Sequence, residues 1–402
     1  MQNKEEAQAS SSLGDKMFVY LDNSATTKPY KEVIAETVKY METHYGNPSS
    51  LHRMGITAEK ALKEARKSVA ASLGAKEEEI YFTSGGTEAD NMALFGAVQA
   101  RKRRGNKIIT SKIEHPAILE SCRKLEEMGF QIEYLTVDQN GLIDMEALEN
   151  SLDDQTILIT IMQVNNEVGS IQPISQISKL KNRIGNKHGT EILLHTDAVQ
   201  SFGKLPIEIS EIDLLSVSGH KIHGPKGAGA LYVKKGLNVS PYIFGGGQER
   251  GLRPGTENVP AITGFGIAAD ISHKNLTKRM ESMKKLKMYL TEGIRSEIPD
   301  IRFNSTDEGS SSILNVSFLG VRGEVLLHTL EQSEIYVSTG SACSSNKKGQ
   351  SHVLKAMARS DKEIEGAIRF SFCEFNTMEE MDYVLLKLKE SVQKFRKLGS
   401  FR

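Results

Sequence analysis

The chain has 402 residues, 39% hydrophobic and 25% charged, which are ordinary proportions for a globular protein with one large core and a second, smaller one. Lysine plus arginine and aspartate plus glutamate both number 51, so the formal net charge is zero. Nothing in this balance favours direct binding to nucleic acid or to an anionic membrane surface. The polar N-terminal segment lacks a signal-like apolar stretch and no apolar run could cross a bilayer, so we expect a cytoplasmic protein that binds a small molecule.

Short apolar strands and helices alternate along most of the chain. Residues 1–16 are predicted to form a disordered tail, and a helix over residues 56–73 is expected to end at Gly74. Between residues 80 and 221, short apolar runs alternate with helical segments, which is typical of a mostly parallel sheet covered by helices on both faces. Further on, a long charge-rich helix at about 260–297 leads to two more strands, which we interpret as a second domain.

Polar and glycine-rich turns follow several of the expected strands. In open α/β sheets, ligands collect beyond the carboxyl ends of the strands, so these turns form the candidate site. The turn SGGT at 84–87 opens a helix and suits a phosphate, although an ordinary strand-to-helix turn has the same composition. Asp197 and Lys221 follow apolar runs, and so does NNE at 165–167. A phosphate cup, an acid that keeps a pyridine nitrogen protonated and a covalently binding lysine are together what pyridoxal phosphate requires.

A series of longer motifs includes these turns. In chain order they are LDNSATT, GNPSSLH, FTSGGTEADN, EHPA, NNEVG, TDAVQSFGK, SVSGHKIHGPKGAGALYV, GGGQERGLRPGTENV, NVSF, STGSAC and IRFS. They resemble the signature segments of group I cysteine desulfurases, the NifS/IscS-type members of the class V aminotransferase superfamily, from about residue 18 to the C-terminal region. The resemblance implies a homodimeric, pyridoxal phosphate-dependent enzyme that takes sulfur from L-cysteine and leaves L-alanine.

The resemblance also implies an architecture. The expected fold is α/β, the fold type I of pyridoxal phosphate-dependent transferases. A large cofactor-binding domain, residues 32–276, would contain a mostly parallel seven-stranded sheet. A smaller α+β domain would combine residues 17–31 with residues 277–402.

Individual residues receive roles from the same resemblance. Lys221 resembles the lysine that binds the cofactor covalently and moves the Cα proton, and Asp197 resembles the partner of the pyridine nitrogen. His115 resembles an imidazole stacked on the ring and placed to transfer a proton, and Gln200 resembles a donor to the ring oxygen. Cys343 resembles the thiol that accepts the sulfur as a persulfide. The residues resembling the phosphate site are Gly86, Thr87, Ser218, His220 and Thr256, the last reaching the phosphate of the other subunit. Those resembling the substrate-carboxylate site are Arg369 and Asn166, which also borders the cofactor.

Some of these residues also have plainer interpretations. From the residues alone, His115 could simply cap the helix that follows it, and Arg369 could be a solvated strand residue. His195 is interpreted as a satisfied histidine at a strand end. The basic run at 101–104 is interpreted as a solvated helix end stabilised by the helix dipole.

The three cysteines differ in their surroundings. Their number and spacing fit neither a disulfide framework nor a metal site, and no metal is expected. Cys122 shares a helical face with apolar neighbours and is expected in the core, and Cys373 is expected to pack in a strand. Small polar residues surround Cys343, which favours an exposed, mobile thiol.

One departure and several alternatives stay open at this point. Group I members commonly continue IRFS with a Gly-Arg pair, whereas this chain has Cys373 and Glu374 shortly after it, so a second substrate-side arginine is absent. A class V aminotransferase would share Lys221 and Asp197 without needing Cys343, and a non-enzymatic scaffold would need no turnover. The expected partner is a sulfur-acceptor protein: an iron-sulfur scaffold, a tRNA-thiolating enzyme or a thiamine-pathway carrier.

Overall fold

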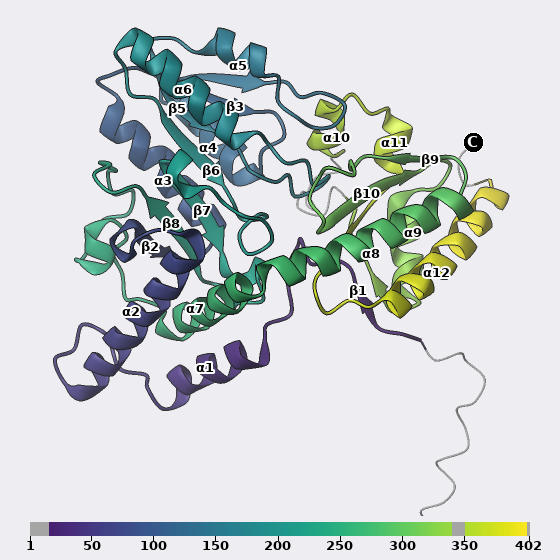
Figure 1. Cartoon of the computed structure of the whole chain (residues 1–402), viewed down its shortest axis with the longest axis horizontal. Helices are drawn as coiled ribbons and strands as arrows, with labels where there is room; N and C mark the ends of the chain where they lie inside the picture. Colours follow the sequence, from purple (N-terminus) through teal and green to yellow (C-terminus); the bar gives the residue numbers. More distant parts are fainter. Residues whose placement is uncertain (1–15, 340–349, 400–402) are drawn as a thin grey trace, which may run out of the picture.

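The computed structural model describes residues 16–339 and 350–399, so nearly all of the predicted tail lies outside the described residues. Its central element is a seven-stranded sheet with the strand order β2-β8-β7-β6-β5-β3-β4 (Figure 1). The strands, in that order, are β2 (Ile80–Thr83), β8 (Gly229–Val233), β7 (Leu214–Ser218), β6 (Leu193–Asp197), β5 (Thr156–Thr160), β3 (Lys107–Ser111) and β4 (Gln131–Leu135). Within this sheet only β8 runs antiparallel to its neighbours. The prediction of a mostly parallel seven-stranded sheet is confirmed.

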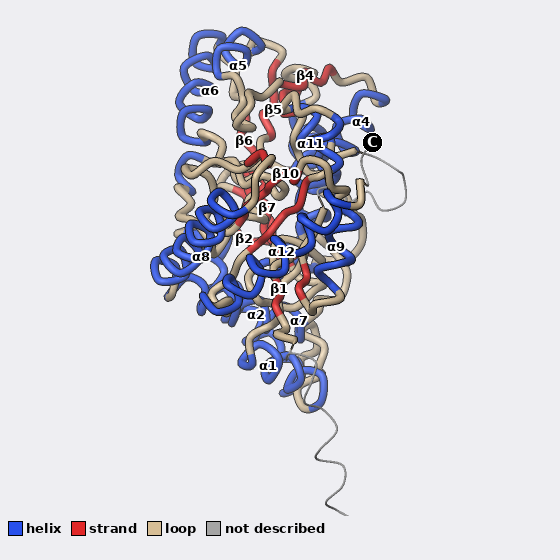
Figure 2. The backbone as a smooth tube through the Cα atoms, turned by 90° about the vertical axis from the view of Figure 1, so that its right-hand side faces the viewer, coloured by secondary structure: helices blue, strands red, loops and turns tan. Residues whose placement is uncertain are grey.

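Helices cover both faces of this sheet, as continuous apolar strands require. One face carries α3 (Gly86–Arg101) and α4 (Pro116–Glu127). The opposite side carries α1 (Lys31–Glu42), α2 (Arg53–Leu73), α5 (Met145–Ser151), α6 (Ile174–His188) and α7 (Val259–Lys274). Ile108 and Ile109 of β3 enter the two opposite cores, because successive side chains of a strand alternate between its faces. Figure 2 shows α4 on one side of the strands and α5 and α6 on the other.

A second core lies where the two ends of the described chain meet. An antiparallel sheet in the order β12-β10-β9 is formed by β9 (Ile301–Phe303), β10 (Ile313–Phe318) and β12 (Ala367–Ser371), and β1 (Val19–Tyr20) pairs in parallel with β11 (Ile335–Tyr336). The helices of this region are α8 (Leu276–Glu297), α9 (Gly323–Glu331), α10 (His352–Ala356), α11 (Asp361–Glu365) and α12 (Met378–Lys397). Val19 and Leu21 pack into its core with residues of α8 and α12. The exact limits of the two domains stay a prediction.

Two helix predictions can be compared with the structure. α2 begins a few residues earlier than expected and ends at Gly74, whose φ of 68° provides the left-handed conformation that glycine adopts most easily. The long helix expected at about 260–297 is two helices, α7 and α8, because the backbone at Asn275 departs from helical geometry. Among the described residues, no helix is both long and apolar enough to cross a bilayer.

Candidate active site

The predicted site residues of the large sheet meet at one edge. Asp197 ends β6, Ser218 ends β7, and the turn containing Asn166 follows β5. These strands are parallel neighbours, so their carboxyl ends lie side by side (Figure 1). The short helix η3 (Gly219–Lys221) continues directly from β7 and places Lys221 beyond the same edge.

Lys221 is held by backbone carbonyls of the N-terminal segment. Its Nζ donates to the carbonyl oxygens of Ser24 at 2.5 Å and Ala25 at 2.7 Å. Thr27 anchors this segment to the lysine turn, since its hydroxyl donates to the carbonyl of His220 at 2.9 Å. The carbonyls of Ser24 and Ala25, both far from Lys221 in the sequence, therefore position its ammonium group.

The start of α3 has the properties of an anion site. At Gly86 a Cβ atom would lie 2.7 Å from Val199 Cγ2, so a side chain does not fit there. Ser218 Oγ is buried and has no hydrogen-bond partner in the described part of the chain. His220 borders the site with its Nδ1 3.2 Å from Thr26 Oγ1, and burial, helped by the Lys221 charge, lowers its pKa to about 4. Free N–H groups of a helix start and an unused hydroxyl suit a phosphate, and Thr87 is exposed on the same turn.

Asp197 is a buried carboxylate. One oxygen accepts the Val199 N–H at 2.9 Å. Burial raises the pKa of Asp197 to about 6, although this hydrogen bond and the Lys221 charge act in the opposite direction. A protonated pyridine nitrogen would supply the positive charge that this carboxylate lacks. The residues present therefore fit pyridoxal phosphate at both its phosphate and its ring.

A buried lysine that the sequence did not single out orients Gln200. Lys204 Nζ donates to Gln200 Oε1 at 3.1 Å, and Gln200 Nε2 donates to the Ser24 carbonyl at 2.9 Å. Because an ammonium group can only donate and a carbonyl can only accept, Lys204 and Ser24 together determine which end of the Gln200 amide is the oxygen. Burial and the Lys221 charge lower the pKa of Lys204 to about 7.

His115 caps α4, as its plainer interpretation predicts. Its Nδ1 accepts the Ala117 N–H at 3.1 Å, so the neutral ring carries its proton on Nε2. Burial, followed by the Lys221 charge, lowers the pKa of His115 to about 4. His115 can cap α4 and also take part in the site, because the cap uses Nδ1 and leaves Nε2 as a donor.

Arg369 lies buried beside Asn166, and the solvated alternative for it is wrong. Its Nη1 donates to the Asn166 carbonyl at 2.9 Å, and its Nη2 pairs with Asp22 Oδ1 at 2.7 Å. Its Nε has no hydrogen-bond partner in the described part of the chain. The sequence did not single out Asp22, although it belongs to the LDNSATT motif.

The remaining candidates lie partly outside the described structure. Cys343 lies outside the described residues. Thr256 is exposed, and Arg253, three residues before it, pairs with Glu88 in the first turn of α3 (Nε to Oε1, 2.7 Å). His195 is fully buried, with its two ring nitrogens 2.8 Å from Thr160 Oγ1 and 3.0 Å from Ser216 Oγ, which confirms a satisfied histidine.

Cys122 lies in the core as expected, whereas Cys373 is buried but follows β12 rather than lying in a strand, and the expectation for the basic run is wrong at Arg101. Cys122 and Cys373 are free and buried, and burial raises the pKa of each thiol to about 12, so neither is a ready nucleophile. Arg101 is buried rather than solvated, because it pairs with Glu191 at 3.1 Å and donates to the Asn238 carbonyl at 3.3 Å. The three residues after it are exposed.

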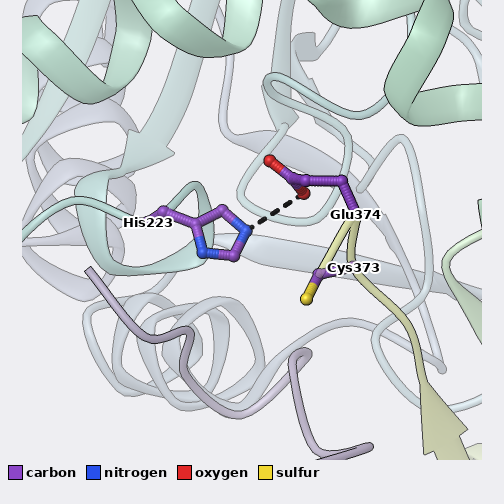
Figure 3. Close-up of side chains that lie close together, drawn as sticks. All are labelled: His223, Cys373 and Glu374. Atoms are coloured by element: carbon purple, nitrogen blue, oxygen red, sulfur yellow. Dashed lines mark ion pairs between the residues drawn. The ribbon is translucent and has the colours of Figure 1, made fainter. Parts of the chain in front are cut away.

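One group among residues 16–339 and 350–399 has the composition of a metal site. His223, Cys373 and Glu374 offer ligand atoms within 4.8 Å of one another (Figure 3). However, Arg279 Nε lies 3.0 Å from Glu374 Oε1 and already provides a positive charge. The group is therefore better described as an ion-pair cluster than as a metal centre.

Comparisons with known proteins identify the family of this chain. The model of the aminotransferase class-V family matches residues 19–384. The cysteine desulfurase IscS of Methanosarcina thermophila is 45% identical over 384 residues, which cover 95% of this chain and 93% of that protein. Its counterpart in Clostridium botulinum is 42% identical over 386 residues, covering 95% and 96%. A solved structure of a NifS-like protein has a TM-score of 0.87 at 41% identity and covers 94% of this chain and 100% of that one. The chain belongs to the aminotransferase class-V family and, within it, to the pyridoxal phosphate-dependent cysteine desulfurases.

Proposed function

We propose that this chain releases sulfur from L-cysteine at the site around Lys221 and leaves L-alanine. The observation that carries the proposal is the meeting of three features at one sheet edge. They are a lysine held by backbone carbonyls, a buried carboxylate with a raised pKa, and a helix start beside a serine hydroxyl that has no partner among the described residues. Bound pyridoxal phosphate withdraws electrons from the substrate carbon that carries its amine.

The residues around the ring bind, orient and move protons. Lys221 holds the cofactor and then removes the proton from the substrate Cα. Asp197 keeps the pyridine nitrogen protonated, and Gln200 donates from Nε2, the amide end left free by Lys204. His115, a neutral imidazole with its proton on Nε2, would border the ring and could donate from that nitrogen, in agreement with its lowered pKa. Gly86, Thr87, Ser218 and His220 bind the phosphate.

We further propose that Arg369 and Asn166 hold the substrate carboxylate and that Cys343 accepts the sulfur. The Cys343 thiolate attacks the substrate sulfur, the Cβ–S bond breaks with its electron pair on carbon, and the carbon takes a proton. Two thiols thus become alanine and one enzyme persulfide, with no external oxidant. Thr339, the last described residue before Cys343, follows Ser338, whose N–H donates to the Arg369 carbonyl at 3.1 Å. Cys343 follows Thr339 by four residues in the sequence.

A homodimer and a separate sulfur acceptor belong to the same proposal. Exposed apolar side chains precede the Thr256 segment, with Phe244 84% exposed, and others lie on and after α1, with Leu51 97% exposed. Such surfaces favour contact with a second copy of the chain. Thr256 of one copy would then complete the phosphate-binding site of the other. An iron-sulfur scaffold, a tRNA-thiolating enzyme or a thiamine-pathway carrier would then take the sulfur in the cytoplasm.

The test compares Cys343→Ser with Cys373→Ser. Cys343→Ser should bind the cofactor and cysteine normally, as shown by visible absorbance, yet release alanine several orders of magnitude more slowly. Cys373→Ser should retain most of the activity, because its thiol is buried and protonated. Mass spectrometry after cysteine treatment should find the added sulfur on the Cys343 peptide. Full desulfuration by Cys343→Ser would contradict the proposal and favour an aminotransferase.

A further inference from the structure

Glu374, the residue that departs from the common Gly-Arg continuation, is surrounded by donors and positive charge. Its Oε1 lies 3.0 Å from Arg279 Nε and accepts a hydrogen bond from the Tyr30 hydroxyl. Its Oε2 lies 3.3 Å from His223 Nε2. Burial raises the pKa of Glu374, but His223 and Arg279 outweigh burial and hold that pKa well below its usual range.

These partners come from different parts of the fold. Glu374 follows β12, Arg279 lies in the first turn of α8, and Tyr30 directly precedes α1. His223 lies two residues after Lys221. Figure 3 shows its ring pointing at the Glu374 carboxylate, with Cys373 beside the pair. One carboxylate of the C-terminal region thus contacts the turn of the proposed cofactor lysine.

His223 is held in an unfavourable backbone conformation. Its φ is 66°, in the left-handed region, which is unfavourable for a residue other than glycine. Its N–H donates to Thr27 Oγ1 at 2.7 Å, and its carbonyl accepts the Tyr30 N–H at 3.1 Å. Such conformations persist where surrounding contacts determine them, and they cluster at functional sites.

The ring of His223 completes this set of contacts. Its Nδ1 lies 2.7 Å from the Lys28 carbonyl, which can only accept, so Nδ1 carries a proton. Nε2 faces Glu374 Oε2 at 3.3 Å, and neither of these two atoms makes a hydrogen bond within the described part of the chain. The rings of Tyr30 and Phe375 pack on the imidazole, with centroids 4.7 Å and 5.0 Å away. Glu374 therefore faces the one ring nitrogen of His223 that the N-terminal segment does not contact.

We propose that Glu374 is a positioning residue for Lys221 and that it acts through His223. The inference rests on the proposed role of Lys221 as the cofactor lysine. A correctly held turn aims Nζ at the cofactor and the substrate Cα. A displaced turn lowers the rate of proton transfer without changing substrate binding at Arg369.

The experiment uses the loaded enzyme and the variants Glu374→Gln, His223→Gln and their combination. Glu374→Gln should shift the pH midpoint of the visible absorbance of the lysine-bound cofactor. It should also lower kcat about tenfold, as small displacements of reacting groups do, with KM for cysteine within about twofold. The double variant should be no worse than His223→Gln alone, because both changes break one contact. Glu374→Asp should restore part of the rate.

Glu380→Gln is the matched control. Glu380 accepts hydrogen bonds from Asn376 Nδ2 at 2.8 Å and from the Thr377 N–H at 3.2 Å, in the same loop and helix start. This control should lower the thermal stability of the cofactor-free protein but leave the absorbance and kcat unchanged. If Glu374→Gln behaves in the same way, Glu374 is only a structural tie and the inference is wrong.

Two further variants separate the possible failures. Lys221→Ala should lose the absorbance of the lysine-bound cofactor; retention of that absorbance would refute the lysine assignment and this inference together. If Lys221→Ala loses the absorbance of the lysine-bound cofactor but Glu374→Gln leaves the spectrum unchanged, only the proposed role of Glu374 is refuted. If Glu374→Gln does not fold, Tyr30→Phe removes one hydrogen bond and keeps both charges. It should produce a smaller shift in the same direction, and no shift would contradict the inference.

Discussion

Asp197 is a buried carboxylate and Glu374 a half-buried one, both near the lysine turn, and their pKa values are shifted in opposite directions. The pKa of Asp197 is raised to about 6, because burial outweighs one backbone N–H and the Lys221 charge. The pKa of Glu374 is lowered, because the opposing charges of His223 and Arg279 outweigh burial. The protein neutralises Glu374 with its own residues, whereas Asp197 suits a cation that arrives with the cofactor.

The surroundings extend this contrast. Asp90 and Glu114 are also buried, and burial, together with the Asp197 charge, raises the pKa of both, that of Glu114 to about 8. His195, 3.7 Å from Asp90, offers no compensation, since burial lowers its pKa to about 3. Three acidic groups with raised pKa values therefore lie close together here, as expected where function rather than stability sets the electrostatics.

The largest expected difference in activity is between Asp197→Asn and Glu374→Gln, which each remove one negative charge. Asp197→Asn should lower kcat by about a thousandfold, in the range seen when a preorganised electrostatic contact to the reacting system is lost. It should also release the cofactor on dialysis, which visible absorbance measures. Glu374→Gln should keep its cofactor and lose about tenfold. Equal losses in the two variants would show that the two carboxylates do not differ as proposed.

A smaller effect should follow from Lys204→Met, which keeps the length of the side chain but removes the donor to Gln200. The Gln200 amide could then turn its oxygen toward the cofactor, so cofactor affinity should fall about tenfold, equivalent to about 1.4 kcal/mol. Equilibrium dialysis measures the change, and Lys204→Arg should be milder because it still donates. In a Gln200→Leu background the effect should vanish; if it persists, Lys204 does not act through Gln200.

The smallest effects should be on the pH dependence of stability in the cofactor-free protein. A raised folded-state pKa means that Glu114 keeps its proton while the unfolded chain loses it, so Glu114 costs stability as pH rises from its ordinary 4.5 to about 8. Glu114→Gln should therefore gain stability relative to the parent across that window, by a few degrees in Tm.

Glu374 should show the opposite trend. Its lowered pKa adds stability that is fully present above its ordinary value of 4.5 and is lost as pH falls below it. Glu374→Gln should therefore remain a constant amount less stable than the parent between pH 5 and 8 and converge with it in acid. Thermal unfolding at several pH values measures both differences. The proposed contrast between the two carboxylates would be contradicted by either of two results. The Tm of Glu114→Gln could run parallel to that of the parent across the pH range, or the stability deficit of Glu374→Gln could change between pH 5 and 8.

The sequence alone determined the fold class and the main candidates for the site. Apolar runs alternating with helices predict a parallel sheet, and the residue after each run must lie at its carboxyl edge. Asp197, Ser218 and the turn before Lys221 were therefore predictable, and Cys343 remains a prediction made from sequence. Gly86 was predictable for a similar reason, since a glycine-rich turn before a helix is a local feature.

Only the tertiary structure decided which remote residues support these candidates. Asp22 pairs with Arg369 across 347 positions, and Ser24 holds Lys221 across 197. From the sequence, Lys204 is an ordinary lysine and Glu374 a departure from a motif. In the structure, Lys204 is buried against Gln200, and Glu374 is half-buried against His223. Hydrogen bonds and ion pairs depend on distance and angle in space, and no periodicity along the chain encodes which distant segments a folded core brings together.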